Sequence, residues 1–405
     1  MKTAFVVAAT AWTLAQGQNA DVVDALKCQN TSGPFSNSLT RGQFATSTYF
    51  DCFRPQEQML GFMDAMMGIM PREMVTKFNI STTFLGRQIP AYKISAGGNK
   101  STVLVLSLHH AREWISGAAA VYSVATLLDD WTNNSSNSTL SRFNSLYDWV
   151  FVPIVNLDGY ITTWTTEERL RRKNMNPLDI TIPYDATRDI SQSGVDLNRN
   201  YGPAEYFNLE PAAKSNLSYP GPYPFSEPES KGIHTWLQAN PQVIGALDIH
   251  SYAGMLLTPF GDVPSGPDAP FDAKFTTLGQ NMQSAILRET GTLYPTQPEY
   301  KLYMAYGTFT DYFFRIYGKP TVTFEIKGKS FIVSPTSIRN GGDHLVSALK
   351  AFSNGLATFM ADLPPTTPTP AVTTAPGGSK TSSAMASALS ACFVVVAMLM
   401  ELVIS

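Results

Sequence analysis

A histidine and a glutamate three residues apart follow an apolar run in this 405-residue chain. The pair is His110 and Glu113, and residues 102–108 before it are aliphatic and β-branched, without glycine or proline. Such a run is typical of a strand buried on both faces in a parallel sheet. Open α/β sheets place their active sites just past the carboxyl ends of such strands. An imidazole and a carboxylate there could converge on one metal ion, although a surface loop could carry the same pair.

A second candidate ligand, His250, ends another apolar run over residues 243–249. It could be a hydrogen-bonded structural residue, but it could also complete a ligand set of His, Glu and His. Three protein ligands and a water are the arrangement of a catalytic zinc, whereas a structural zinc takes four ligands, usually cysteines. The chain has only three cysteines. The ligand types therefore favour a catalytic zinc over a structural one.

Six motifs together give the chain a resemblance to a known family. They are His-Ala-Arg-Glu-Trp (110–114), Arg-Leu-Arg-Arg-Lys (169–173), Gly-Val-Asp-Leu-Asn-Arg-Asn (194–200), His-Ser-Tyr (250–252), Tyr303 and Thr-Phe-Glu (323–325). In their order and spacing the chain resembles the zinc metallocarboxypeptidases of the carboxypeptidase A/B type, from about residue 46 to about residue 363. The resemblance implies an α/β/α sandwich around a mixed, mostly parallel eight-stranded twisted sheet. It also implies a hydrolase with one zinc ion per chain that removes C-terminal residues from peptides and proteins.

By this resemblance the zinc ion is held by His110, Glu113 and His250. Two imidazoles and one carboxylate leave the ion cationic enough to acidify a water and polarise a carbonyl. Asp196 matches the aspartate that accepts a hydrogen bond from the first zinc histidine and so fixes its tautomer. The alternative for Asp196 is that it caps a turn.

Two further residues take catalytic roles by the same resemblance. Glu325 follows the β-branched run 320–324 and matches the general base that moves a proton from water to the leaving amine. The alternative for Glu325 is a buried ion pair. Arg172 matches the arginine that, together with zinc, stabilises the oxyanion of the tetrahedral intermediate. We expect the other charges of its motif to form a solvated basic face, namely Arg169, Arg171 and Lys173.

Five residues match positions that bind the substrate. Asn198 and Arg199 correspond to the pair that holds the free C-terminal carboxylate, and a planar guanidinium can hold it through two parallel hydrogen bonds. Such a clamp would make the enzyme an exopeptidase. Tyr303 corresponds to the mobile tyrosine that closes over this carboxylate. Arg112 and Tyr252 match residues that line the neighbouring upstream subsite.

The residue that selects the departing side chain in the family lies seven positions after Tyr303 and fifteen before Glu325, which is Thr310 by both counts. Thr310 is uncharged and cannot pair with a buried charged side chain. Asp311 matches a position where the family has an aspartate whatever its specificity. Five other expected lining residues are uncharged: Leu257, Gly261, Leu302, Ala305 and Thr323. The resemblance therefore implies a pocket of the A type, for apolar or aromatic residues, with an unusual polar preference set by Thr310 as the alternative.

The residues disfavour two other classes of function. A catalytically silent surface protein that only holds C-termini predicts the loss of a zinc ligand or of the base, and none is missing. A serine hydrolase is disfavoured because the chain contains no Gly-x-Ser-x-Gly elbow. The net charge of −3 gives no reason to expect nucleic-acid binding, and we expect a monomer.

Both ends of the chain are typical of targeting segments. Residues 1–17 combine a positive start with an apolar core, which predicts a signal peptide, and seven Asn-x-Ser/Thr sequons favour secretion. A Pro/Thr/Ser-rich stalk over 364–387 precedes a hydrophobic tail over 388–405, the order of a GPI-anchor signal. A transmembrane helix is the alternative, but the apolar run is short for a span of ~20 residues. We expect an extracellular protein tethered to the membrane by a GPI anchor.

The catalytic domain is expected over residues 46–363. The preceding segment, 18–45, is too short for the inhibitory prodomain of digestive family members, so we expect none, as in members of the carboxypeptidase O type. Cys28 and Cys52 could pair in an oxidising compartment. Three helices are expected, over 56–70, 115–128 and 343–363, the last with Asp343 as its N-cap.

Overall fold

A computed structural model of the chain describes residues 20–31, 39–95, 97–98, 100–133, 146–165, 167–178, 193–207 and 216–361. The predicted signal peptide, stalk and hydrophobic tail lie outside these residues. Over the described ranges, the helices are all too short or too polar to cross a membrane.

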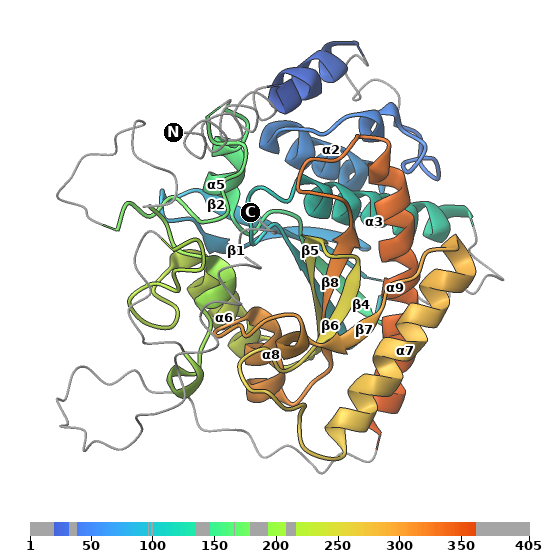
Figure 1. The fold of residues 1–405 in the computed structure, drawn as a ribbon. Coiled ribbons are helices and arrows are strands. Elements are labelled where there is room, and N and C mark those ends of the chain that lie inside the picture. Colours follow the sequence, from blue (N-terminus) through green and yellow to red (C-terminus); the bar gives the residue numbers. More distant parts are fainter. Residues whose placement is uncertain are drawn as a thin grey trace, which may run out of the picture. The chain divides into compact units, whose positions relative to one another are not determined.

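One mixed eight-stranded sheet forms the centre of the fold (Figure 1). Its order is β1-β2-β4-β3-β5-β8-β6-β7, and the four central strands β4, β3, β5 and β8 run parallel. The pairs β1/β2, β2/β4 and β6/β8 are antiparallel. The strands are β1 (Val75–Thr82), β2 (Gln88–Ile94), β3 (Thr102–Ser107), β4 (Asp148–Val152), β5 (Val243–Tyr252), β6 (Met255–Thr258), β7 (Thr296–Pro298) and β8 (Thr321–Lys327).

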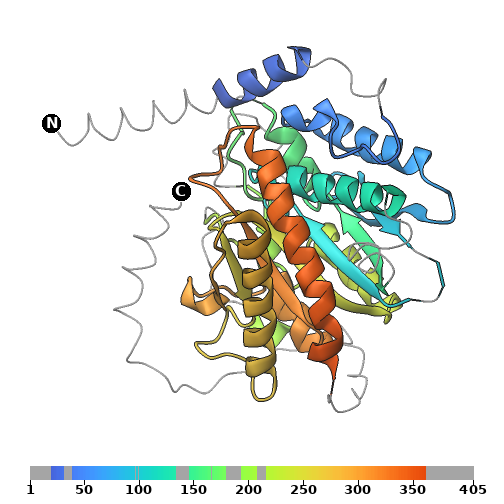
Figure 2. The same cartoon turned by 90° about the vertical axis from the view of Figure 1, so that its right-hand side faces the viewer.

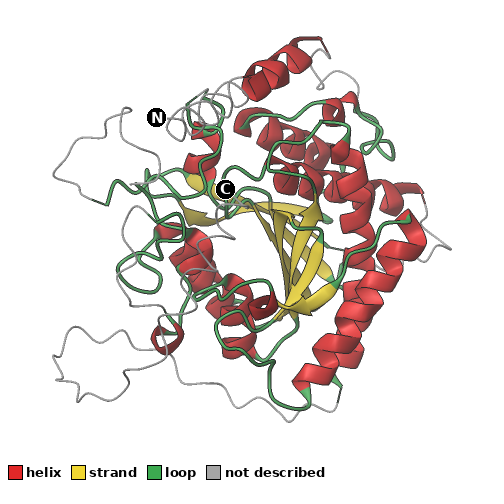
Figure 3. Cartoon of the chain, in the orientation of Figure 1, coloured by secondary structure: helices red, strands yellow, loops and turns green. Residues whose placement is uncertain are grey.

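Helices cover both faces of this sheet, which confirms the expected sandwich (Figure 3). Helices α3, α7 and α9 lie over one face, where Figure 2 shows α7 and α9 side by side, and α6 and α8 lie over the other. The helices are α2 (Gln56–Ile69), α3 (Trp114–Asn133), α5 (Leu157–Thr162), α6 (Pro228–Ala239), α7 (Phe271–Thr290), α8 (Phe309–Tyr317) and α9 (Ser337–Met360).

The central strands are apolar on both faces because both faces are covered. Every residue of β3 is buried, and so are all but two of the ten residues of β5. A strand in this environment carries a continuous apolar run rather than an alternating one. Because β3, β5 and β8 are parallel, their carboxyl ends meet at one edge of the sheet, and the residues that follow them are brought together there.

The final helix starts earlier than expected. Asp343 was predicted as its N-cap after two glycines, but α9 begins at Ser337 and contains Gly341 and Gly342. A Cβ atom at Gly342 would overlap the ring of Tyr122 on α3, so the glycine allows the two helices to approach closely. Asp343 instead accepts a hydrogen bond from the Tyr122 hydroxyl at 3.1 Å. The glycines therefore serve helix packing and not a helix start.

The segment before the expected catalytic domain contains a helix over residues 20–31. Its Val22 and Ala25 are buried, and Cys28 forms a disulfide with Cys52. Asp21 forms an ion pair with Arg169. This helix is therefore attached to the domain by apolar contacts, one covalent bond and one ion pair.

Candidate active site

The three predicted metal ligands converge at the carboxyl edge of the central strands. His110 and Glu113 follow β3, and His250 belongs to β5. His110 Nδ1 lies 2.8 Å from Glu113 Oε1, while His250 Nδ1 lies 3.0 Å from both His110 Nδ1 and Glu113 Oε2. All three side chains are buried. Two ring nitrogens and a carboxylate thus converge on a single position.

This donor set fits a zinc ion. A tetrahedral zinc with bonds near 2.1 Å holds its ligand atoms about 3.4 Å apart. The three donors of this chain lie 2.8–3.0 Å apart, so a shift of a few tenths of an ångström would accommodate the ion. Two imidazole nitrogens and one carboxylate also leave a fourth position for water or substrate. His110, Glu113 and His250 would therefore hold zinc as a catalytic centre does.

The electrostatics of the site favour positive charge between these side chains. Burial lowers the pKa of His250, but Asp248 and Glu113 outweigh it and raise that pKa well above its usual value. Burial likewise opposes ionisation of Glu113, but the two histidines hold its pKa well below the usual range. A carboxylate that stays ionised while buried is suited to a cationic ligand.

Asp196 fixes the first histidine ligand. Its Oδ1 lies 3.1 Å from His110 Nε2, so that nitrogen carries the proton and Nδ1 is left for the metal. Its Oδ2 accepts a hydrogen bond from Arg172 Nε at 2.8 Å. The same carboxylate accepts the backbone N–H of Asn198 at 3.0 Å, so Asp196 also caps the short helix that follows it. The two interpretations of Asp196 are therefore compatible.

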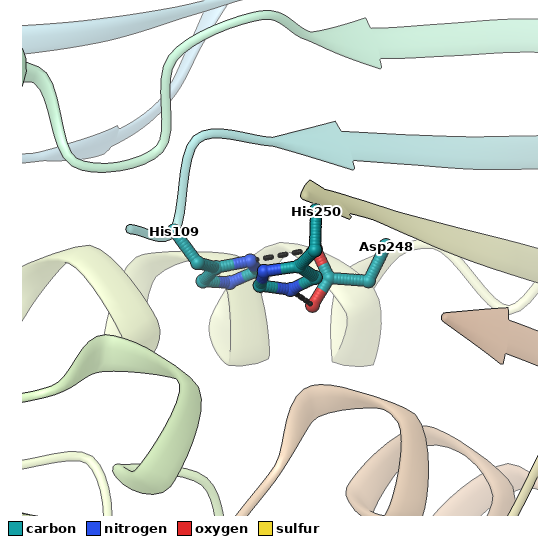
Figure 4. Close-up of side chains that lie close together, drawn as sticks. All are labelled: His109, Asp248 and His250. Atoms are coloured by element: carbon teal, nitrogen blue, oxygen red, sulfur yellow. Dashed lines mark hydrogen bonds and ion pairs between the residues drawn. The ribbon is translucent and has the colours of Figure 1, made fainter. Parts of the chain in front are cut away.

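A second histidine, His109, supports the other ligand through Asp248, and neither residue was predicted from the sequence (Figure 4). Asp248 Oδ2 lies 2.8 Å from His250 Nε2, and Asp248 Oδ1 lies 2.7 Å from His109 Nδ1. His109 Nε2 in turn lies 2.9 Å from the Tyr201 hydroxyl. A signal was present, because residues two apart on a strand point to the same face. Asp248 precedes His250 by two positions in β5 and is therefore placed to orient it.

Glu325 stands beside the metal ligands on the next strand. It lies directly opposite His250 in the register of β5 and β8. Its Oε2 accepts the backbone N–H of Ala253 at 3.3 Å. Burial raises the pKa of Glu325 to about 7, against the opposing effect of His250. A carboxyl group with a pKa near neutrality can both accept and return a proton.

The predicted solvated basic face is wrong. Arg169 and Arg171 are each only 1% exposed, and Lys173 is buried as well. The Arg169 guanidinium lies 3.7 Å from the centre of the Trp114 ring and donates to the carbonyl oxygen of Arg112 at 2.8 Å. Arg171 pairs with the nearby Glu168 at 3.2 Å, and Lys173 donates to the carbonyl oxygen of Asn216 at 3.1 Å, so these buried charges have partners.

Arg172 is the member of this motif that reaches the metal ligands. One of its guanidinium nitrogens lies 3.4 Å from His110 Nδ1, and another lies 2.7 Å from Asp196 Oδ2. The ion pair with Asp196 fixes the orientation of the guanidinium, which points at the region between the ligands. A positive charge held there can stabilise an oxyanion.

Asn198, Arg199 and Tyr303 form one group next to the metal ligands. Arg199, which is buried, donates a hydrogen bond to the Tyr303 hydroxyl at 3.0 Å. Asn198 Nδ2 lies 3.1 Å from His250 Nε2, and Asn198 Oδ1 accepts the backbone N–H of Phe309 at 2.8 Å. Tyr303 is 39% exposed, so its ring lies at the surface above the guanidinium. This arrangement suits a clamp for a carboxylate.

Arg112 and Tyr252 meet at a third side chain that the sequence analysis did not identify, Phe331. The Arg112 guanidinium lies 3.9 Å from the centre of the Phe331 ring, and the Tyr252 ring meets the same ring edge-on at 4.8 Å. Arg112 Nε is buried and has no hydrogen-bond partner within the described ranges. It can therefore donate to a carbonyl oxygen of a bound peptide.

The residues expected around the departing side chain also lie together. Thr310 on α8 and Thr323 on β8 are buried, and their hydroxyls are 2.6 Å apart. Leu257 lies opposite Thr323 in the register of β6 and β8. Asp311 accepts the backbone N–H of Gly261 at 2.8 Å, so its carboxylate is engaged with the backbone.

One acid in this region, Glu299, was missed by the sequence analysis. A Cβ atom at Gly261 would lie 3.1 Å from the carboxyl carbon of Glu299, and Glu299 is only 3% exposed. No local pattern marks it, since it follows a three-residue strand and a proline.

The zinc carboxypeptidase family matches residues 59–346, and the chain belongs to this family. It is 31% identical over 262 residues to the protein named inactive metallocarboxypeptidase ECM14 of Paracoccidioides brasiliensis, which covers 62% of this chain and 42% of that protein. It is 28% identical over 263 residues to the protein of the same name from Sclerotinia sclerotiorum, with 62% and 41% covered. The chain thus spans about two fifths of the length of these relatives.

Two solved structures have the same fold. Thrombin-activatable fibrinolysis inhibitor superposes with a TM-score of 0.70 at 22% identity, covering 83% of this chain and 80% of that one. Carboxypeptidase A from Helicoverpa armigera superposes with a TM-score of 0.67 at 23% identity, covering 85% and 80%.

Proposed function

We propose that this chain is a zinc-dependent exopeptidase that hydrolyses the C-terminal peptide bond of peptides and proteins. The observation that carries the proposal is the convergence of His110 Nδ1, His250 Nδ1 and the Glu113 carboxylate beside Glu325. His110, Glu113 and His250 would hold the zinc ion, which would supply a Lewis acid to polarise the scissile carbonyl and to acidify a water molecule. The other site residues position the substrate around this peptide bond, transfer a proton and stabilise the developing charge.

Substrate position is set by buried arginines on either side of the bond. Arg199 and Asn198 bind the free carboxylate of the last residue, and the Tyr303 hydroxyl already meets the same guanidinium. Arg112, with its unpartnered Nε, binds a carbonyl oxygen upstream. Because the clamp recognises a carboxylate, the reaction is limited to the last bond of the chain.

Proton transfer falls to Glu325 and charge stabilisation to Arg172. Glu325 accepts a proton from the attacking water and delivers it to the nitrogen of the departing amino acid, which its pKa of about 7 allows. Arg172 stabilises the developing oxyanion. Its guanidinium is held by Asp196 at 2.7 Å and therefore needs little reorganisation during the reaction.

The preference for the last side chain is the finer part of the proposal. The uncharged pair Thr310 and Thr323 supports the apolar or aromatic preference expected from the sequence, or a polar one. Glu299 supports a cationic preference instead, because it adds a carboxylate to the same region.

A catalytically silent protein that binds C-termini is the alternative function. The relatives named inactive metallocarboxypeptidases support it, although the chain spans only about two fifths of their length. The residues themselves favour activity, because three metal ligands, a base and an oxyanion arginine are all present and adjacent. A protein that only binds C-termini would need neither Glu325 as a base nor Arg172 to stabilise an oxyanion.

We also propose an extracellular location with a GPI anchor at the membrane. The disulfide between Cys28 and Cys52 supports an oxidising compartment. Sequon asparagines are exposed at Asn30, Asn79, Asn133 and Asn216, as glycan acceptors must be. The anchor signal itself belongs to the tail outside the described residues.

The proposed reaction is tested with zinc-loaded protein and an unmodified peptide, followed by mass spectrometry. We expect stepwise loss of residues from the C-terminus, its arrest by a metal chelator and its recovery when zinc is returned. Internal cleavage, or turnover that survives complete removal of the metal, would contradict the proposal. Failure to cleave any of a panel of peptides with varied last residues would favour the silent binding protein.

A further inference from the structure

Glu299 is a buried acid among the residues expected around the departing side chain. It opens the short helix Glu299–Lys301 that follows β7, and it is 3% exposed. Backbone hydrogen bonds from Tyr300 to Phe260 and from Ala305 to Gly261 hold this segment against the end of β6, at 3.0 and 2.9 Å. The missing side chain at Gly261 leaves the space that the Glu299 carboxyl group approaches.

The Glu299 carboxylate has an unused hydrogen-bonding oxygen. Among the described residues, its Oε2 has no partner. In the described part of the chain, each of the two neighbouring acids also has one buried oxygen without a partner, Asp311 Oδ1 and Asp262 Oδ2. Their other oxygens are engaged, because Asp311 accepts the Gly261 N–H at 2.8 Å and Asp262 pairs with Arg315 at 2.6 Å. A buried carboxylate without a partner is costly. The position is therefore suited to a cation supplied from outside the chain.

Two other sources of that cation fit less well. Arg199 is close enough to influence Glu299, but its guanidinium donates to the Asn198 carbonyl and the Tyr303 hydroxyl and faces the substrate carboxylate. A metal ion is disfavoured, because the described donor groups that could hold one surround His250 and do not include Glu299. The remaining source is the side chain of a bound substrate.

We propose that Glu299 selects substrates whose last residue carries a cationic side chain, lysine or arginine. The inference rests on the proposed peptidase function and replaces the apolar preference expected from Thr310 alone. Burial raises the pKa of Glu299 to about 7, against the opposing effect of Arg199, and an entering cation would favour the ionised form. The hydroxyls of Thr310 and Thr323 offer further acceptors, whereas an acidic side chain would be repelled.

The test uses peptides that differ only in the last residue, ending in Arg, Lys, Leu, Phe or Glu. For the zinc-loaded wild type we expect kcat/KM to be at least about 30-fold higher for Arg or Lys than for Leu or Phe. Glu299→Gln should remove this ratio, mainly by losing activity on the cationic peptides. Glu289→Gln is the matched control, since Glu289 pairs with Arg288 on the exposed side of α7 and should leave the ratio unchanged.

The inference is overturned if the wild type prefers Leu or Phe, or if Glu299→Gln keeps the wild-type ratio. The preference for cationic over apolar peptides is measured on the wild-type protein alone. This part of the test therefore holds even if Glu299→Gln folds poorly. If no peptide is hydrolysed, the proposed function fails and binding decides the inference separately. Fluorescent peptides would then be titrated with the zinc-loaded wild-type protein. Tenfold tighter binding of the Arg peptide than of the Leu peptide would support the role of Glu299. Equal binding of the two peptides would exclude it.

Discussion

Asp248 Oδ2 lies 2.8 Å from His250 Nε2, on the side of the ring opposite the metal-binding nitrogen. The other oxygen of Asp248 lies 2.7 Å from His109 Nδ1, which holds the carboxylate in place (Figure 4). A carboxylate at this position fixes the tautomer and the orientation of a metal-binding imidazole and increases its basicity. His250 is thereby oriented before any metal arrives.

Weakening this support should weaken zinc binding. We expect Asp248→Asn and His109→Gln each to lower zinc affinity by about 10- to 100-fold, because groups that orient metal ligands contribute on this scale. Affinity would be measured by competition with a chelator of known strength. Asp24→Asn, at an exposed position, is the control. Unchanged affinity in both variants would show that His250 needs no help from Asp248.

The carboxylate clamp predicts a strong dependence on the free C-terminus. A peptide amide should be hydrolysed at least about 100-fold more slowly than the matching peptide acid, since Arg199 would have no carboxylate to bind. Arg199→Lys should also fall far below wild type, because an ammonium does not reproduce two parallel hydrogen bonds. Rates on both peptides would be compared with those of Arg288→Lys, which lies at the surface. Equal rates for acid and amide would exclude an exopeptidase clamp.

Glu229, which has no role in the proposed reaction, should make the stability of the fold depend on pH. This residue is buried, and burial raises its pKa to about 8, although its carboxylate accepts the Phe84 N–H at 3.0 Å. An unfolded glutamate has a pKa near 4.3. Between about pH 4.5 and pH 8 the folded state therefore holds a proton that the unfolded state has lost, and the free energy of unfolding falls as the pH rises.

Glu229→Gln should remove this part of the pH dependence, because an amide stays neutral and can still accept the Phe84 N–H. From pH 5 to pH 8, the free energy of unfolding of the variant should rise relative to that of the wild type by on the order of 3 kcal/mol. Denaturant unfolding at several pH values measures the difference, with the exposed Glu57→Gln as control. Parallel curves for wild type and Glu229→Gln would mean that Glu229 ionises normally in the folded protein.

The sequence predicted the metal triad because its signals are local. His110 and Glu113 follow one apolar run, His250 ends another, and both runs are central strands whose carboxyl ends meet. Asp248 was also within reach of such reasoning, since strand periodicity places it on the same face as His250. The whole eight-stranded sandwich, in contrast, was implied by family resemblance and not by periodicity.

Features that depend on contacts between distant segments could not be predicted. Arg169 is buried because Asp21, 148 residues away, and Trp114 surround it. Glu299 faces Gly261 only because the segment after β7 packs against the end of β6. Nothing in the residues beside Arg169 or Glu299 specifies these neighbours.

Above all, we propose that Glu325 acts as a base at a zinc site formed by His110, Glu113 and His250. The most direct measurement is zinc content and peptide turnover on the same preparations of wild type, Glu325→Gln and Glu113→Gln. We expect Glu325→Gln to keep its zinc and lose about a thousandfold or more in kcat, and Glu113→Gln to lose zinc and turnover together. Near-normal turnover in zinc-loaded Glu325→Gln, or full zinc occupancy in Glu113→Gln, would contradict the account.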